Sequence, residues 1–364
     1  MKKRAITLAG GGPAAGLHLG ALQRLAEEGI KFDIWALSCI GAWVGIVYNQ
    51  CDLGKEPEQA IKFFHDNVFR DDRSYSRFPV NTVFGPDIGS NTRAVMQFLV
   101  NPDSYKNIWL PDDMMTALKQ SMEFFLDAKK WNEGDFNHWM LDQVLAVNPF
   151  SRFVTSLMYL SPVTGLSRIY YPDSSFLNAI EFKRVREAGK PFIYHNAWNL
   201  NQQRMDQFSN HPKAGYKQMT AQTLCACSAL PYIEGTVDIE GETYCEGALV
   251  DTVNFKNLLE HHRNELDEIW VSRIVDIKQV RAPRNIAEAL GNLCMLFAGA
   301  LGDDDVKLFK FHAKEEGFPV DKIIELQVAT DITFEWTHSN LERGIRDGRK
   351  AAEDALKRHK PKPS

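Results

Sequence analysis

The sequence predicts an α/β protein with a mainly parallel central sheet. Residues 4–9 have the apolar pattern of a strand, "GGGPAAG" forms a tight loop, and "LHLGALQRLAEEG" is an amphipathic helix that ends at Gly29. A second strand covers residues 32–37. A strand, a helix and a strand within so few residues are typical of a unit that feeds a parallel sheet.

Two further core strands are expected much later in the chain, in "KPFIYHNAWNL" (190–200) and "DEIWVSRIVD" (267–276). The intervening residues 52–190 are rich in aromatic side chains and less periodic, apart from one amphipathic helix in "MMTALKQSMEFFLDAKKW". We therefore interpret residues 1–364 as one domain in which 52–190 form an insertion or cap.

Composition limits the class of protein. With 364 residues, 44% of them hydrophobic, the chain can bury a large core, and its net charge of −5 gives no uniform positive field for nucleic acid. The apolar stretch after "MKKR" is too short for a signal peptide, so the six cysteines are expected to be reduced thiols in the cytoplasm. Cys225 and Cys227 lack further ligands at metal-binding spacing, so no metal site is expected.

Two helices are expected near the C-terminus. The apolar run "AEALGNLCMLFAGAL" (287–301) is too short to span a bilayer, and we interpret it as a buried helix rather than a lid that faces substrate or membrane. The charged segment "HSNLERGIRDGRKAAEDALKRHK" is expected to be a terminal helix with a solvated face.

The stretch "DIWALSCIGAWVGIVY" (33–48) indicates a sharp turn from a strand into a helix. Such a turn presents a Ser or Cys nucleophile and favours small residues two positions before and after it. Ser38 would place Ile40 at the crowded downstream position, whereas Cys39 places Gly41 there and loses only the upstream glycine, to Leu37. Cys39 is therefore the predicted nucleophile, with Gly41 supporting the turn.

The chain resembles the patatin-like phospholipase family in three separated places: "LAGGGPAAGLHLGALQRLAEEGI", "ALSCIGAWVG" and "CSALPYIEGTVDIEGETYCEGALVDTVN". These are similar to the family's oxyanion loop, its G-x-S-x-G turn and its run that ends in D-G-G/A. The resemblance implies a three-layer α/β/α fold. It also implies a catalytic dyad in which Cys39 replaces the usual Ser and Glu246 replaces the usual Asp.

The resemblance further implies an oxyanion hole built from backbone amides, since glycine permits close approach to a substrate. Ala14 and Ala15 stand where the family usually has Arg and Gly. A dinucleotide-binding loop is the weaker interpretation of this segment, because no acidic ribose partner follows a second strand. The residues that the resemblance assigns to the hole are Gly10, Gly11, Gly12 and Ile40.

Two effects on the Cys39 thiol oppose each other. The N-terminus of the following helix lowers its pKa, and the negative charge of Glu246 raises it. The sequence leaves this balance open. We interpret His18 as a packing or loop-bracing residue rather than a third catalytic group, Cys245 as a small buried strand residue, and Asp251 as a loop-capping carboxylate.

The expected activity is hydrolysis of a lipid-like acyl ester or thioester through an acyl-Cys39 intermediate, without a cofactor. Transfer of the acyl group to another acceptor is an alternative, because a thioester intermediate is activated toward transfer. A non-catalytic acyl-binding protein is another, since the chain departs from the family pattern at each chemical position. A lipid substrate also implies peripheral contact with a membrane, and the oligomeric state is left open.

Overall fold

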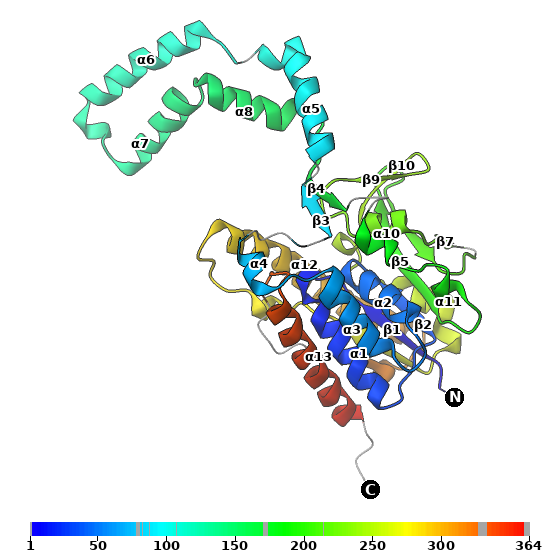
Figure 1. The fold of residues 1–364 in the computed structure, drawn as a ribbon. Helices are drawn as coiled ribbons and strands as arrows, with labels where there is room; N and C mark the ends of the chain where they lie inside the picture. Colours follow the sequence, from blue (N-terminus) through cyan, green and yellow to red (C-terminus); the bar gives the residue numbers. More distant parts are fainter. Residues whose placement is uncertain are drawn as a thin grey trace. The chain divides into compact units, whose positions relative to one another are not determined.

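The computed structural model describes residues 2–77, 81, 83–86, 88–106, 108–169, 174–213, 215–326 and 333–359. The chain divides into two compact units (Figure 1). Unit 1 comprises Met1–Gly85 and Ser167–Ser364, and unit 2 comprises Pro86–Leu166.

The strands are β1 (Arg4–Leu8), β2 (Ile34–Leu37), β3 (Phe84–Pro86), β4 (Gly165–Ile169), β5 (Phe192–Asn199), β6 (Arg204–Ser209), β7 (Lys217–Gln218), β8 (Tyr232–Glu234), β9 (Val237–Ile239), β10 (Glu242–Glu246), β11 (Glu268–Ser272) and β12 (Ile323–Leu326). The α-helices are α1 (Ala15–Glu27), α2 (Ile40–Gln50), α3 (Glu56–Asn67), α4 (Asp72–Arg77), α5 (Ile88–Val100), α6 (Pro111–Leu126), α7 (Glu133–Trp139), α8 (Pro149–Leu160), α9 (Ser175–Asn178), α10 (Ala221–Cys227), α11 (Lys256–His262), α12 (Ile286–Glu315) and α13 (His338–His359).

The main sheet has nine strands within the described residues, with the order β12-β11-β1-β2-β5-β10-β9, with β6 paired to β5 and with β7 paired to β6. The pairs from β12 to β5 are parallel, whereas β10, β9 and β6 pair in antiparallel fashion. All four strands predicted from the sequence lie in the parallel part, which confirms the predicted fold class. A smaller sheet of β3, β4 and β8 accompanies it.

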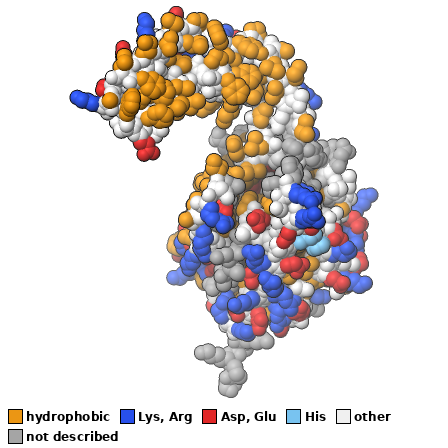
Figure 2. Space-filling model, turned by 60° about the vertical axis from the view of Figure 1, so that its left-hand side comes forward, with side chains coloured by type: hydrophobic (Ala, Val, Ile, Leu, Met, Phe, Trp, Pro, Cys, Tyr) orange, Lys and Arg blue, Asp and Glu red, His pale blue; other side chains and the backbone are white. Residues whose placement is uncertain are grey.

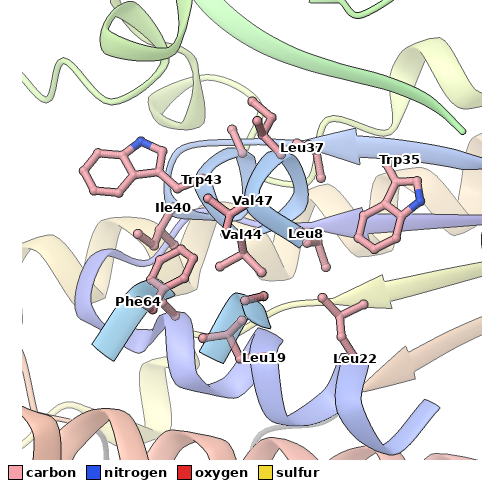
Figure 3. Close-up of a cluster of buried hydrophobic side chains, with 14 of the residues drawn as sticks. Leu8, Leu19, Leu22, Trp35, Leu37, Ile40, Trp43, Val44, Val47 and Phe64 are labelled. Atoms are coloured by element: carbon pink, nitrogen blue, oxygen red, sulfur yellow. The ribbon is translucent and has the colours of Figure 1, made fainter. Parts of the chain in front are cut away.

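Alternate side chains of the parallel strands enter two separate cores, because successive residues of a strand point to opposite faces. Ile6 and Leu8 pack with α1, α2 and α13, while Ala5 and Ile34 pack with α11 and α12. Figure 3 shows Leu8 and Leu37 of the sheet beside Val44 and Val47 of α2, with Trp43 of the same helix near Ile40. The sheet thus lies between two helical layers, as predicted.

Glycines set the contact between α1 and α13. A Cβ atom on Gly20 would lie 1.9 Å from the Ile345 carbonyl oxygen, and one on Gly348 would lie 2.1 Å from the Leu17 carbonyl oxygen. The two helix backbones therefore touch directly. The terminal helix has the predicted charged face, but its small residues form a second face that holds α1, the helix that follows the glycine loop.

Residues 86–166, the middle of the predicted insertion 52–190, form unit 2, whereas α3 packs against α1 and α2 in unit 1. The predicted amphipathic helix is α6. Among the described residues of unit 2, the buried hydrophobic side chains are Ala94, Phe98, Ala117 and Phe124. Hydrophobic side chains cover much of its surface in Figure 2.

The apolar run 287–301 belongs to α12, and its interpretation as a buried helix is wrong for the outward face. Met295 is buried, but Leu293 and Phe297 are 48% and 57% exposed. The helix covers the sheet with one face, and hydrophobic periodicity cannot tell whether anything covers the other. In the described part of the chain we find no helix with the length and apolar character needed to cross a bilayer.

Candidate active site

Cys39 occupies the turn between β2 and α2 with φ 48° and ψ −123°, in the strained region that a nucleophile turn requires. A Cβ atom on Gly41 would lie 2.1 Å from the Leu8 carbonyl oxygen, so only glycine fits there. The large upstream residue Leu37 is accommodated by a second glycine, because a Cβ on Gly45 would lie 2.6 Å from the Leu37 methyl groups. The sequence therefore compensates for the missing upstream glycine within α2.

Glu246 ends β10 and is buried, with 6% of its surface exposed. Strand β5 lies between β2 and β10 in the sheet, and Glu246 pairs with Ala197 on it. The Cys39 thiol is hydrogen-bonded to the Glu246 carboxylate. Two residues that are far apart in the sequence thus meet at one end of the sheet, as a dyad requires.

Burial decides the pKa of the Cys39 thiol, on which the helix N-terminus and the Glu246 charge have opposite effects. Desolvation, the Glu246 charge and the nearby Cys227 together raise the pKa of the Cys39 thiol well above its usual value, while a hydrogen bond from the Ile40 N–H lowers it by less. Burial also raises the pKa of Glu246 to about 7, against the opposing effect of its hydrogen bond with Cys39. At neutral pH the thiol is therefore protonated and Glu246 is partly ionised.

The glycine loop passes directly beside this pair. A Cβ atom on Gly10 would lie 3.2 Å from the Cys39 Cβ and 3.9 Å from Glu246 Oε1. Gly12 has φ 51°, a left-handed conformation that favours glycine. The Gly10 N–H donates a long hydrogen bond of 3.4 Å to the Thr252 carbonyl, and the Ile40 N–H points to the Cys39 sulfur.

Asn196, a polar residue that sequence reasoning did not single out, holds the turn in place. Ser38 Oγ donates to Asn196 Oδ1 at 2.8 Å, and Asn196 Nδ2 donates to the Asp251 carbonyl at 2.8 Å. This chain of contacts joins the turn, β5 and the segment after Glu246. An asparagine in the middle of the strand "FIYHNAWN" was the available signal, because a buried amide needs partners.

Cys227 is a second residue that the sequence did not link to the site. Its sulfur accepts a hydrogen bond from the Cys39 N–H at 3.1 Å. Among the residues that the structure describes, no group of three His, Cys, Asp or Glu side chains could hold a metal ion. Cys227 therefore supports the nucleophile turn from α10.

His18 braces the glycine loop, as predicted. Its Nε2 donates to the Ala9 carbonyl at 3.0 Å, and its Nδ1 accepts from Ser272 Oγ at 2.8 Å. Burial lowers the pKa of His18 to about 4, so the ring is neutral. Cys245 is buried in β10, and Asp251 accepts the Asn254 N–H at 2.6 Å as a loop cap.

A strained strand-to-helix turn beside a parallel sheet, a buried carboxylate and a glycine loop define a class of α/β proteins with a nucleophile turn. Comparison with known families matches residues 6–259 to Patatin, the patatin-like phospholipase family. The chain belongs to this family and is an ester-hydrolysing enzyme.

Two other comparisons add less. The crystal structure of VipD from Legionella pneumophila is similar over 98% of this chain and 67% of VipD, with 15% sequence identity and a TM-score of 0.44. No curated protein matched the sequence.

Proposed function

We propose that the protein hydrolyses lipid acyl esters or thioesters through a covalent acyl-Cys39 intermediate. The proposal rests on one observation: the thiol of the strained turn is hydrogen-bonded to a buried carboxylate beside the glycine loop. The family membership supports a lipid acyl group as substrate.

The raised pKa of the thiol favours attack with proton transfer over attack by a preformed thiolate. The Cys39 sulfur bonds to the carbonyl carbon while its proton passes to ionised Glu246. That proton goes to the leaving alcohol or thiol when the bond to it breaks. Water then gives a proton to Glu246 and attacks the thioester, and the proton returns to the sulfur as the C–S bond breaks.

Each tetrahedral intermediate carries a negative oxygen that needs hydrogen-bond donors. The proposed donors are the Ile40 N–H and the amides of the Gly10–Gly12 loop. Because the Gly10 N–H already reaches toward Thr252, Gly11 and Gly12 carry more of this role. Relative to the family pattern, Cys39 replaces a Ser and Glu246 replaces an Asp. Both replacements fall on the two side chains that contact each other in the proposed dyad.

The first test is intact-mass spectrometry after incubation with short-chain and long-chain p-nitrophenyl esters. We expect an acyl adduct on the peptide that contains Cys39. Cys39→Ala should abolish the adduct and turnover, Cys39→Ser should nearly abolish turnover, and Glu246→Gln should reduce turnover by ~10²–10⁴-fold with the fold intact. Cys245→Ala is the matched control, because it removes a neighbouring buried thiol.

An adduct on another cysteine, or full activity in Cys39→Ala, would contradict the assignment. Added alcohol acceptors separate hydrolysis from transfer: acyl transfer to the acceptor at the expense of free acid would identify a transferase. Binding of acyl ligand without any turnover by the parent would identify the non-catalytic alternative.

A further inference from the structure

The outward face of α12 is apolar without interruption over residues 289–301. Residues 289–301 contain no charged side chain. Within this stretch, Leu290, Leu293, Leu296 and Phe297 are 39%, 48%, 45% and 57% exposed. Their spacing of three and four residues, together with Ile286, makes one continuous stripe along the helix.

The second half of the same helix has an ordinary surface. Asp304, Lys307, Lys314 and Glu315 lie on its exposed face, and Lys307 pairs with Asp303 and Asp304. Leu308 and Phe311 are as exposed as the stripe residues, at 49% and 59%, but they lie among these charges. The apolar stripe therefore runs over residues 286–301, where Glu288, paired with Arg284, is the one charged residue, and not over α12 as a whole.

The stripe lies on the helix that borders the candidate active site. Burial, with the nearby charge of Glu246, raises the pKa of Cys294 on the inner side of this stretch. One turn beyond the stripe, Asp305 accepts the Thr252 N–H at 2.8 Å, in the loop that follows Glu246. A molecule that covers the stripe therefore meets the protein beside the dyad.

We propose that the stripe 286–301 of α12 docks the protein onto the surface of a zwitterionic lipid aggregate from which the substrate is taken. This inference rests on the proposed function, because a lipid substrate resides in such an aggregate. An amphipathic helix binds a lipid interface by inserting its apolar face among the acyl chains.

The charge and the area of the stripe favour a zwitterionic lipid surface as the partner that covers it. The stripe has no basic residue between 289 and 301 and the protein carries a net charge of −5, so attraction to anionic lipid is not the driving force. At 1.5 Å per residue the stripe is about 20 Å long and roughly 10 Å wide. It covers about 200 Å², far below the ~800 Å² per partner of a stable protein dimer.

The test measures cosedimentation with phosphatidylcholine vesicles on a Cys39→Ala background, so that binding is read without catalysis. The doubly substituted variant Leu293→Asp/Phe297→Asp should bind vesicles at least tenfold more weakly, because each change removes a large inserted side chain. The matched control is Leu308→Asp/Phe311→Asp on the charged half of α12, which should bind like the parent. Leu293→Ala/Phe297→Ala gives a milder second variant.

With Cys39 present, the stripe variant should also lose hydrolysis of vesicle lipid while it keeps hydrolysis of a soluble short-chain p-nitrophenyl ester. If the parent hydrolyses neither the vesicle lipid nor the soluble ester, the proposed function is refuted. The vesicle-binding result then tests the docking proposal by itself. Binding by the parent should vary less than twofold with added salt.

Four results would overturn the docking proposal. These are no vesicle binding by the parent, equal binding by the stripe variant, equal loss in the control, or loss only after Met122→Asp/Phe125→Asp in unit 2. A large fall in melting temperature of both stripe variants without a change in vesicle binding would also overturn it, because the stripe would then be covered by protein.

Discussion

The proton positions at Cys39 and Glu246 follow from burial. The pKa of both groups is raised. The pKa of the Cys39 thiol is well above its usual value, whereas that of the Glu246 carboxyl is about 7. Over a range above pH 7 the pair therefore holds a neutral thiol beside an ionised carboxylate. In the proposed mechanism, this is the state in which Glu246 accepts the thiol proton as Cys39 attacks.

The pH dependence of the reaction should follow the ionisation of the Glu246 carboxyl. Since the base must be ionised, kcat/KM for a soluble ester should rise with pH through about 7 and then level off. The measurement is a pH–rate profile between pH 5 and 9 with ionic strength held constant. A profile that stays flat across pH 7 would show that another group is the base.

At the scale of elements, the site depends on contacts in which glycine lets two backbones touch. Gly41 brings α2 against β1, and Gly45 makes room for Leu37. Gly16 and Gly20 bring α1 against α13, and α1 begins directly after the loop that passes beside Cys39. Helix packing thus fixes the start of α1 and, with it, the glycine loop.

Gly20→Ala tests this contact. The new Cβ would lie 1.9 Å from the Ile345 carbonyl oxygen, so the helices must separate, and we expect a loss of ~2 kcal/mol or more in the free energy of unfolding. Gly89→Ala on α5 is the control, because a Cβ there meets nothing within 4 Å. It should leave stability unchanged or raise it by ~0.5–1 kcal/mol. Denaturant titration measures both, and equal stability of the two variants would contradict the contact.

For the whole molecule, three buried carboxyl groups in and around the candidate active site reduce stability as the pH rises toward 7. Buried Glu246, Asp251 and Asp305 have a pKa of about 7, about 7 and about 6. A carboxyl whose pKa is raised on folding stabilises the fold below its unfolded pKa, and this contribution is lost as pH rises through the folded pKa. Buried His18 and His195, each with a pKa of about 4, act in the opposite direction between about pH 4 and 6.5.

Glu246→Gln isolates one of these contributions. Glutamine resembles the protonated carboxyl, so the variant should match the parent in melting temperature at pH 4, below the unfolded pKa of 4.5, and exceed it at pH 8. The expected gain at pH 8 is on the order of 2 kcal/mol. Thermal unfolding at the two pH values measures it, with activity lost in the same variant. A variant less stable than the parent at pH 8 would mean that ionised Glu246 contributes favourable contacts.

The sequence by itself determined the parallel sheet and the turn at Cys39. These predictions depend on local requirements that leave a local pattern. A buried parallel strand needs a run of apolar residues, and a nucleophile turn needs a small residue at the position of Gly41. The resemblance to the family then supplied Glu246, which no spacing rule could have reached across about 200 intervening residues.

The tertiary structure alone decided how these residues are set for chemistry. The pKa of Cys39 depends on burial and on Glu246, and the turn depends on Asn196 and Cys227, which come from β5 and α10. The structure also decided that the apolar run in α12 is half uncovered. The physical reason is the same in each case: desolvation and packing are set by neighbours distant in sequence, whereas periodicity records only which side of an element is apolar.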